Sequence, residues 1–563
     1  MYETLKTVWR ELTGPGGDFE VETLEVRGFP MRTFKTAAPS LREFWLGTTV
    51  FGDRPYLVYE QEVLTYSQVH DRVNSLSAWM QDQGLVPGDR VAIAMRNFPE
   101  WLQCYWATVA SGLTVVGMNA WWVEDEMDYA LTDAAPKLLI ADEERLARFA
   151  AIRDQHSDIA CVSVRSKPRD WAMPFESIMA IAGSMPEVAI DPDHDACIFY
   201  TSGTTGRPKG AQQTHRGCVH NVMNMGFWGN CLAQTMHRFK GQPLPDPETA
   251  PVPSALVTTP LFHVTANNCL AQATTLGGGK LVHMYKWDAG DALALIEREK
   301  ITSLTGVPVM SRELIGHPDF AKFDTSSLMS VGGGGAQLQP DLVGKIDEAV
   351  MNARPSTGYG MTETCGIITS ISGDFFLDRP DSCGPAMPSF EAKTVDANGQ
   401  DTNGMPGELW VRGAPVIKGY LNRTDATAET ITDGWLHTGD VATIDADGFI
   451  YIVDRVKDMV LRGGENIYCS EVETVLYQIE NLAECSVFGV PDDRLGEEVG
   501  VAIYSKPGAA IDAEDIRGYC ATKMAKHKIP RYIWLLDTPL PRNASGKFLK
   551  RELKDQLSLQ DAV

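Results

Sequence analysis

The chain has 563 residues, which is too long for one hydrophobic core and predicts three or four structural units. Its 44% hydrophobic and 22% charged residues are ordinary for a globular protein, and a net charge of −24 argues against a nucleic-acid-binding surface. A polyanionic ligand must therefore be met by local positive charge rather than by the overall field.

The first residues lack the apolar core of a signal peptide. No stretch reaches about 18 uninterrupted apolar residues, so no transmembrane segment is expected. The eleven cysteines are dispersed and lack metal-binding spacing, which is typical of reduced thiols in a cytoplasmic protein.

Residues 1–50 predict an irregular N-terminal segment. From residue 90 onward, short apolar runs alternate with helical stretches. Strands are expected at 90–95, 113–117, 137–141 and 196–200, with helices at 100–111 and 124–135. Strand–helix–strand repetition predicts parallel sheets covered by helices.

The stretch 201–210, Thr-Ser-Gly-Thr-Thr-Gly-Arg-Pro-Lys-Gly, directly follows the strand predicted at 196–200. Glycines let a backbone approach a ligand, and successive N–H groups can hold anionic oxygens. The hydroxyls and Lys209 add donors and a charge, so the pattern predicts a polyphosphate loop. It is not a Walker A loop, because two residues separate Gly203 from Gly206 and Gly210 follows the lysine. A flexible surface loop is the alternative.

The strand–helix pattern resumes beyond this loop. Strands are expected at 255–258, 279–283, 301–304 and 328–331. The proline-rich stretch 235–254 predicts an exposed insertion. The glycines at 332–335 suit a wall that a flat ligand touches, with a loose loop as the alternative.

The pattern of predicted secondary structure changes at about residue 383. Short strands at 393–399, 407–412 and 449–453 alternate with turn residues and predict a small antiparallel barrel or sandwich. After residue 455 comes a unit of about a hundred residues with both helical and strand patterns, which has the size of a separate domain.

Six blocks stand in order along the chain, at 200–210, 260–263, 358–363, 434–440, 454–458 with 463–467, and 541–547. Together they resemble the adenylate-forming superfamily of acyl-CoA synthetases, luciferases and stand-alone adenylation domains, over about residues 40–555. The resemblance implies an α/β fold with a large N-terminal domain of two parallel-type sheets, residues 1–454, including a β-barrel subdomain at about 383–454. It also implies a hinge at 455–458 and a mobile α+β C-terminal domain at 459–563.

The resemblance implies that a carboxylate attacks the α-phosphorus of ATP and that coenzyme A then attacks the acyl-adenylate. Catalysis of the first half-reaction is mainly positioning and charge stabilisation. The implied ligands are therefore ATP, Mg²⁺, coenzyme A and a small carboxylic acid.

Four residues have implied catalytic roles: Lys547, Thr362, Glu363 and His263. Lys547 bridges the carboxylate and the α-phosphate, and Thr362 is a donor to that phosphate. Glu363 lies beside Mg²⁺ with Thr204 or Thr205, since Mg²⁺ prefers oxygen ligands. Read alone, Thr362 and Glu363 could equally begin a helix.

A larger set is implied to bind the nucleotide or to move with it. Its members are Thr201, Ser202, Gly203, Thr204, Thr205, Gly206, Lys209, Gly334, Gly335, Ala336, Thr357, Gly358, Tyr359, Gly360, Asp440, Arg455, Lys457, Gly463 and Gly464. Asp440 suits both ribose hydroxyls, although an Asp after Thr-Gly is also a common turn residue. Lys457 aligns with the hinge.

His263 follows Pro-Leu-Phe in the block at the mouth of the acyl pocket. Amino-acid-activating relatives carry Asp beside that Phe, so an amino-acid substrate is disfavoured. The other residues expected to line the pocket are Val264, Asn267, Asn268, Gly306, Val307 and Gly333. For coenzyme A, Lys526, Lys528 and Arg531 form a small basic patch.

The sequence leaves the acid open, between a short- or medium-chain fatty acid and an aryl acid. An acyl-AMP ligase, a luciferase-like enzyme or a module without catalysis are the alternatives to a carboxylate–CoA ligase. A homodimer is a further expectation.

Overall fold

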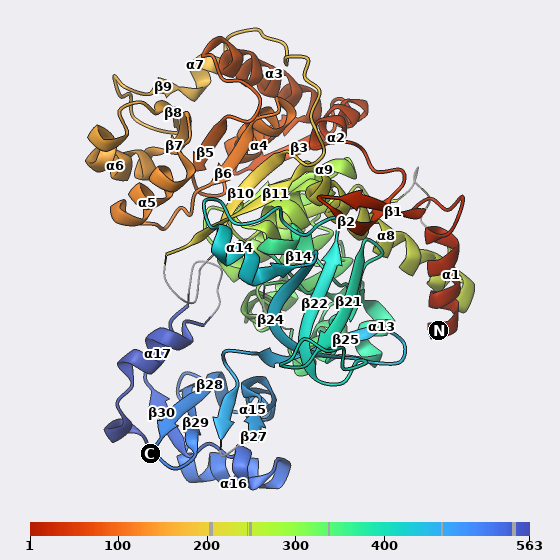
Figure 1. Ribbon diagram of the computed structural model, residues 1–563, viewed down its shortest axis with the longest axis vertical. Coiled ribbons are helices and arrows are strands. Elements are labelled where there is room, and N and C mark those ends of the chain that lie inside the picture. The colour runs from red at the N-terminus through yellow and green to blue at the C-terminus, as the bar shows by residue number, and fades with distance from the viewer. Residues whose placement is uncertain are drawn as a thin grey trace.

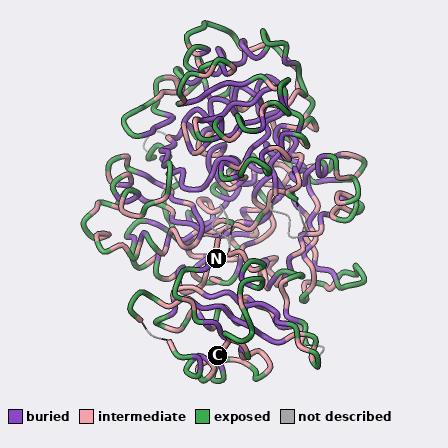
Figure 2. The backbone as a smooth tube through the Cα atoms, turned by 90° about the vertical axis from the view of Figure 1, so that its left-hand side faces the viewer, coloured by how far each residue is buried: buried purple, intermediate pink, exposed green. Residues whose placement is uncertain are grey.

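The computed structural model describes residues 1–201, 207–244, 246, 250–335, 338–462, 465–509, 511–542 and 548–563. The sheets of the long N-terminal part lie together, and the C-terminal elements β28–β30 and α15–α17 form the lower end of the molecule (Figure 1). Buried residues run through the interior of the molecule, and exposed residues follow its outer turns (Figure 2).

The first sheet has seven strands in the order β11-β10-β6-β5-β7-β8-β9. They are β5 Arg90–Ala94, β6 Thr114–Gly117, β7 Leu138–Asp142, β8 Ala160–Val164, β9 Met173–Pro174, β10 Asp195–Thr201 and β11 Lys209–Thr214. Its helices are α3 Tyr66–Asp82, α4 Pro99–Ala110, α5 Glu124–Ala134, α6 Glu143–Ile152 and α7 Phe175–Met179. All pairings are parallel except β10 with β11, so the predicted parallel sheet is confirmed.

The second sheet has eight strands in the order β19-β16-β15-β14-β12-β13-β3-β4. They are β3 Pro55–Tyr59, β4 Glu62–Thr65, β12 Ser254–Val257, β13 Lys280–His283, β14 Ser303–Gly306, β15 Ser330–Gly333, β16 Arg354–Thr357 and β19 Ile371–Ser372. The helices around it are α8 His215–Lys240, the π-helix η3 Thr265–Gln272, α9 Ala273–Leu276, α10 Ala289–Glu299, α11 Pro308–Ile315, α12 Pro340–Ala349 and α13 Gly373–Asp378. The run from β3 through β16 is parallel, as predicted.

The third sheet is antiparallel, in the order β20-β25-β24-β22-β21, with β23 paired to β24. Its strands are β20 Gly384–Pro385, β21 Phe390–Val395, β22 Gly407–Gly413, β23 Ile431–Thr432, β24 Trp435–Ile444 and β25 Phe449–Arg455, and α14 Thr424–Thr430 follows β22. No pairing joins β20 to β21 in the described part of the chain, so the predicted barrel or sandwich is a single open sheet.

The C-terminal part contains a mixed sheet with its own core. Its elements are β26 Val460–Arg462, β27 Glu465–Ile467, α15 Cys469–Leu476, β28 Leu482–Asp492, β29 Gly496–Ser505, α16 Ala513–Lys523, β30 Tyr532–Leu536 and α17 Lys550–Gln556. Buried apolar side chains such as Val472, Val487, Ile503 and Ile533 share one cluster within this part. This separate core supports a domain at 459–563, whose boundary stays a prediction.

The N-terminal 50 residues are regular, so the predicted irregular segment is wrong. They form α1 Tyr2–Thr13, β1 Val21–Val26, β2 Phe29–Phe34 and α2 Leu41–Gly47. Leu5, Val8 and Leu12 recur at helical spacing and are buried in α1, which gives this helix an apolar face to pack.

The predicted insertion at 235–254 begins too early, because α8 runs to Lys240. Gly241 ends that helix in the left-handed conformation, with φ 69°. Among the described residues, no helix is long and apolar enough to cross a bilayer.

Candidate active site

Three neighbouring parallel strands of the second sheet end side by side at predicted site residues. Gly306, Gly333 and Thr357 are the last residues of β14, β15 and β16 and pair in register. The Thr357 Oγ1 donates to Gly333 O at 3.0 Å. Ligands of open α/β sheets bind outside the carboxyl ends of the strands, so this edge is a candidate ligand site.

The glycines after β15 form a close wall beside the π-helix. A Cβ added to Gly334 would lie 3.4 Å from Thr265 Cγ2 of η3. Gly335 has φ +74°, a left-handed conformation that favours glycine. The side chain of Val307 lies 3.9 Å from the same added Cβ position at Gly335. This arrangement fits a narrow, flat binding surface.

His263 lies between the end of β12 and the π-helix. It is half-buried, its ring is 4.6 Å from that of Phe262, and its carbonyl accepts from the Asn267 N–H at 3.0 Å. Val264 precedes the helix and is buried. π-Helices are rare and are frequent at functional sites.

Asn267 is fully buried, and its amide faces other protein side chains. Trp101 Nε1 donates to Asn267 Oδ1 at 3.3 Å, and Asn267 Nδ2 donates to Asn268 Oδ1 at 2.8 Å. Both ends of the amide are thus engaged inside the protein, which is a structural use of a residue expected in the acyl pocket.

Thr362 and Glu363 stand in the short 3₁₀ turn η5 Thr362–Thr364. The Tyr420 hydroxyl donates to Glu363 Oε1 at 2.7 Å, and the Ile417 N–H donates to Glu363 O at 2.9 Å. Gln213 Nε2 donates to Thr362 O at 2.8 Å. The turn is therefore anchored to two other segments, and the Glu363 carboxylate is buried and oriented.

The turn preceding Glu363 is linked to the third sheet through Asp440. The Tyr359 hydroxyl donates to Asp440 Oδ2 at 2.5 Å, and Arg455 Nε lies 3.4 Å from Asp440 Oδ1. Burial, and then the Asp440 carboxylate, raise the pKa of Tyr359, so its hydroxyl stays a donor. Gly360 packs tightly, since an added Cβ would lie 2.0 Å from the Gly366 carbonyl oxygen. The wall residues 357–360 and Asp440 are thus neighbours.

The predicted phosphate loop joins β10 to β11, whose ends pair at Thr201 and Lys209. Lys209 Nζ lies 4.7 Å from the centroid of the Tyr420 ring, so the loop's lysine reaches the segment that contacts Glu363. The remaining loop residues, Ser202, Gly203, Thr204, Thr205 and Gly206, lie outside the described residues, as do Ala336, Gly463, Gly464 and Lys547.

The hinge lysine and the basic patch belong to the C-terminal side. Lys457 is exposed in the turn after β25. Lys528 pairs with Glu471 at 2.7 Å, and Arg531 pairs with Asp492 at 3.1 Å. Two of the three patch cations are thus paired with carboxylates, and both Lys526 and Arg531 are exposed.

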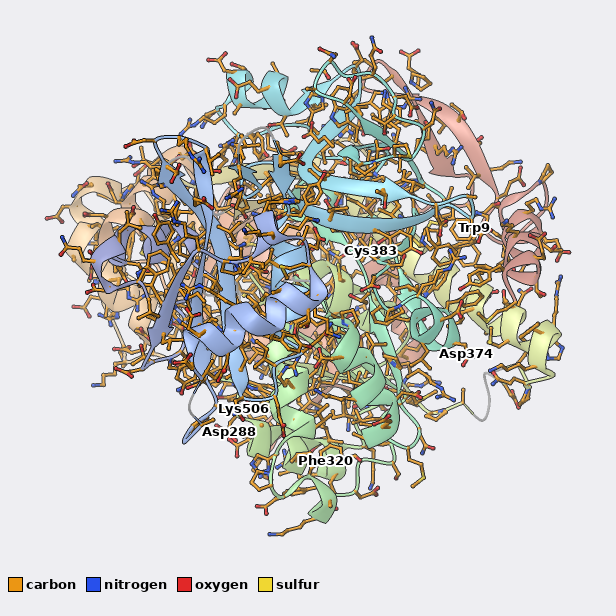
Figure 3. All side chains as sticks on the ribbon, turned by 90° about the horizontal axis from the view of Figure 1, so that it is seen from below. Trp9, Asp288, Phe320, Asp374, Cys383 and Lys506 are labelled. Carbon is orange, nitrogen blue, oxygen red and sulfur yellow. The ribbon has the colours of Figure 1, made fainter. Side chains whose placement is uncertain are left out.

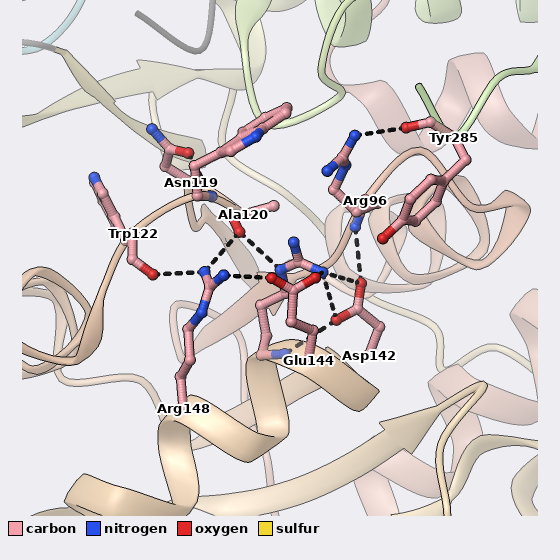
Figure 4. Close-up of polar contacts among 10 residues, drawn as sticks. Arg96, Asn119, Ala120, Trp122, Asp142, Glu144, Arg148 and Tyr285 are labelled. Atoms are coloured by element: carbon pink, nitrogen blue, oxygen red, sulfur yellow. Dashed lines mark hydrogen bonds and ion pairs between the residues drawn. The ribbon is translucent and has the colours of Figure 1, made fainter. Parts of the chain in front are cut away.

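A buried ion pair holds the turn that carries Ala120 and Trp121, next to Phe262 of the predicted acyl-pocket mouth (Figure 4). Arg145 Nη1 donates to Asp142 Oδ2 at 3.0 Å, and Arg145 Nε donates to Ala120 O at 2.8 Å. This fixes the turn that sets the Trp121 ring 5.4 Å from the Phe262 ring. Trp121 is 42% exposed, at the outer edge of the predicted pocket mouth.

Comparison with known proteins decides the family. Residues 45–421 match the AMP-binding enzyme family, and residues 471–547 match the AMP-binding enzyme C-terminal domain. The chain belongs to the AMP-binding enzyme family. The predicted resemblance to acyl-CoA synthetases of the adenylate-forming superfamily is thereby confirmed.

Relatives of this AMP-binding enzyme cover nearly its whole length. Feruloyl-CoA synthase of Amycolatopsis sp is 34% identical over 495 residues, 87% of this chain and 93% of that protein. The Rhodococcus jostii (strain RHA1) 3-[(3aS,4S,7aS)-7a-methyl-1,5-dioxo-octahydro-1H-inden-4-yl]propanoyl:CoA ligase is 32% identical over 510 residues, 88% of this chain and 94% of that protein. The crystal structure of the anthranilate CoA ligase AuaEII in complex with anthranoyl-AMP superimposes with a TM-score of 0.82 at 25% identity, covering 92% and 96% of the two chains.

Sequence reasoning missed Tyr420 in this AMP-binding enzyme. Its local signal was only a Gly-Tyr pair in the loop after the strand predicted at 407–412. Glu363, which it contacts, lies 57 residues earlier, so no spacing rule connects the two.

A separate cavity of about 850 Å³ lies between α1 and the antiparallel sheet. Trp9, labelled in Figure 3, lines it with Arg32, Lys393 and Trp435. No predicted site residue is among its described lining residues, so the candidate site rests on the strand ends and not on this cavity.

Proposed function

We propose that this chain is an AMP-forming carboxylate–CoA ligase. In the first half-reaction a carboxylate oxygen attacks the α-phosphorus of ATP, and pyrophosphate leaves. In the second, the coenzyme A thiol attacks the acyl carbon, and AMP leaves. The observation that carries this proposal is the hydrogen bond from Tyr359, four residues before Glu363, to Asp440, in a chain whose relatives are CoA ligases.

The roles follow from the chemistry of each group. Asp440 accepts from the ribose hydroxyls, and the backbone at 357–360 forms the wall against the adenine. Thr362 donates to the α-phosphate, where negative charge builds up during attack. Lys547, from the C-terminal part, completes the positive charge there.

Glu363 suits a magnesium ion that is held mainly by phosphates and water. One of its oxygens accepts from Tyr420, and no hydrogen bond to the other is found among the described residues. No three His, Cys, Asp or Glu side chains gather as a metal cage in the described part of the chain. Mg²⁺ typically uses one or two carboxylates plus substrate phosphates, so this donor set fits, with Thr204 or Thr205 as further neighbours.

An aryl acid is the first substrate class to test. Phe262, His263 and Trp121 line one side of the predicted mouth, and flat aromatic surfaces stack well with one another. The names feruloyl-CoA synthase and anthranilate CoA ligase refer to aromatic acids. Short- and medium-chain fatty acids remain the second class.

The test is an assay with ATP, Mg²⁺ and a panel of aryl and C3–C12 acids, with and without coenzyme A. AMP and thioester formed together, in equal amounts, are expected. AMP without thioester would favour an acyl-AMP ligase or a luciferase-like enzyme instead. No ATP consumption with any acid would contradict the proposal.

Two further properties stay predictions of this proposal. A homodimer is tested by light scattering on the eluted protein. Cytoplasmic location is tested by fractionation of cells that express the protein at its natural level.

A further inference from the structure

Tyr420 lies in the segment between β22 and α14, and that segment is fixed against β11. The Leu421 N–H donates to Gly210 O at 2.8 Å, and the Gln212 N–H donates to Gly419 O at 2.9 Å. Tyr420 itself is 7% exposed. Backbone bonds on both sides therefore hold the ring in one place.

The side chain of Tyr420 contacts two predicted site residues at once. Its hydroxyl donates to Glu363 Oε1 at 2.7 Å, and its ring centroid lies 4.7 Å from Lys209 Nζ. Glu363 and Lys209 come from different elements, η5 and β11. No ion pair joins these two charged groups within the described residues, so the tyrosine stands as their common neighbour.

These contacts orient both charges without neutralising either. An aromatic face attracts an ammonium through its quadrupole and leaves the positive charge in place for a later anion. A hydroxyl donor fixes a carboxylate and leaves its second oxygen open. Preorganised charges need no rearrangement when the ligand arrives, which is how such sites gain affinity and rate.

We propose that Tyr420 is a positioning residue that holds Glu363 for the metal side and Lys209 for the phosphate side of the triphosphate. This inference rests on the proposed function, since both partners have their roles there. It assigns two separable tasks to one side chain, the hydroxyl to Glu363 and the ring to Lys209.

The test uses two variants of the full chain. Tyr420→Phe removes the hydroxyl and keeps the ring, and we expect the Mg²⁺ concentration needed for half-maximal binding of α,β-methylene-ATP to rise about tenfold. Tyr420→Leu also removes the ring, and we expect binding of the same analogue without Mg²⁺ to weaken about threefold in addition.

A second measurement reports on Lys209 without any turnover. Acetylation of Lys209 by acetic anhydride, followed by mass spectrometry, is expected to accelerate several-fold in Tyr420→Leu and to stay unchanged in Tyr420→Phe. If Tyr420→Leu does not fold, Tyr420→Met replaces it, and Tyr420→Phe decides the hydroxyl task by itself.

The matched control is Tyr451→Phe, which removes a different tyrosine–carboxylate bond, from Tyr451 Oη to Asp445 Oδ2 at 3.2 Å. It should leave the Mg²⁺ dependence unchanged. A lower melting temperature in both Tyr420 variants, with unchanged Mg²⁺ dependence and unchanged Lys209 acetylation, would overturn the inference. Failure of the wild type to consume ATP with any acid would instead contradict the proposed function, while the analogue-binding and acetylation results would still decide the role of Tyr420.

Discussion

The two sides of the candidate site are held in different ways. On the large side, two short side-chain hydrogen bonds connect separate elements, one from Tyr359 to Asp440 and one from Tyr420 to Glu363. On the C-terminal side, the chain continues through the turn after β25, and the carboxylate of Asp454 in β25 accepts from the Cys469 N–H. These contacts preorganise the large side, and we expect the contribution of the C-terminal side to depend on its orientation.

The largest effect is expected for Lys547→Ala. It removes the positive charge that the C-terminal part is proposed to place at the α-phosphate, and it leaves the residues of the large side unchanged. The rate of adenylation should fall roughly 10²–10³-fold, as for the loss of one preorganised donor. Pyrophosphate exchange measures this, with the exposed Lys554→Ala as the matched control. Undiminished exchange in Lys547→Ala would show that the large side works alone.

A substitution at the hinge separates orientation from chemistry. Lys457 is exposed, and its N–H has no hydrogen bond among the described residues, so proline removes no contact there. Lys457→Pro restricts φ, and we expect thioester formation to fall roughly 10²-fold through misplacement while pyrophosphate exchange is spared. Lys457→Ala, which keeps rotation free, is the control. Equal loss of both half-reactions would place the hinge elsewhere.

A smaller effect is expected on the preorganised side. Asp440→Asn removes the negative charge that accepts a hydrogen bond from Tyr359 and is expected to accept from the ribose hydroxyls. The affinity for ATP should therefore fall roughly 10- to 100-fold. Calorimetry measures the dissociation constant, and Asp445→Asn, in the turn between β24 and β25, is the control. Unchanged affinity for ATP would remove Asp440 from the nucleotide site.

The smallest effect concerns stability at the junction. Burial raises the pKa of Asp454 to about 6. The folded state therefore binds this proton more tightly than the unfolded state, whose pKa is about 4, and stability is lost as pH rises through 6.

We therefore expect Asp454→Asn to stabilise the protein relative to the wild type by up to ~2 kcal/mol at pH 8 and by little at pH 4. Asn can still accept from the Cys469 N–H through its side-chain oxygen. Melting temperatures across this pH range measure the difference, with the exposed Asp561→Asn as the control. A stability difference that is independent of pH would contradict the burial of an ionised Asp454.

Most of the architecture could be predicted from periodicity. The strands at 90–94, 114–117 and 138–142 are continuous apolar runs between helical patterns, and such runs identify buried parallel strands. The β1–β2 hairpin was missed because its turn uses Arg27 and Gly28, both with positive φ, rather than the common Asn-Gly pair.

Only the site residues that belong to short sequence motifs could be predicted. Short motifs identified Glu363 and Asp440, and the fold brings Asp440 to Tyr359, four residues before Glu363. Tyr420 was missed because only the folded structure brings it into contact with Glu363 and Lys209, which lie far from it in the sequence. Asn267 suited a pocket by its position after His263, but the buried Trp101 and Asn268 engage its amide.

The most direct test of the shared site is a crystal structure with a non-hydrolysable acyl-adenylate analogue. We predict that the ribose hydroxyls lie within hydrogen-bond distance of Asp440, that the adenine contacts residues 357–360, and that the acyl group passes His263. An analogue bound away from Asp440 and from the carboxyl ends of β14, β15 and β16 would contradict the account.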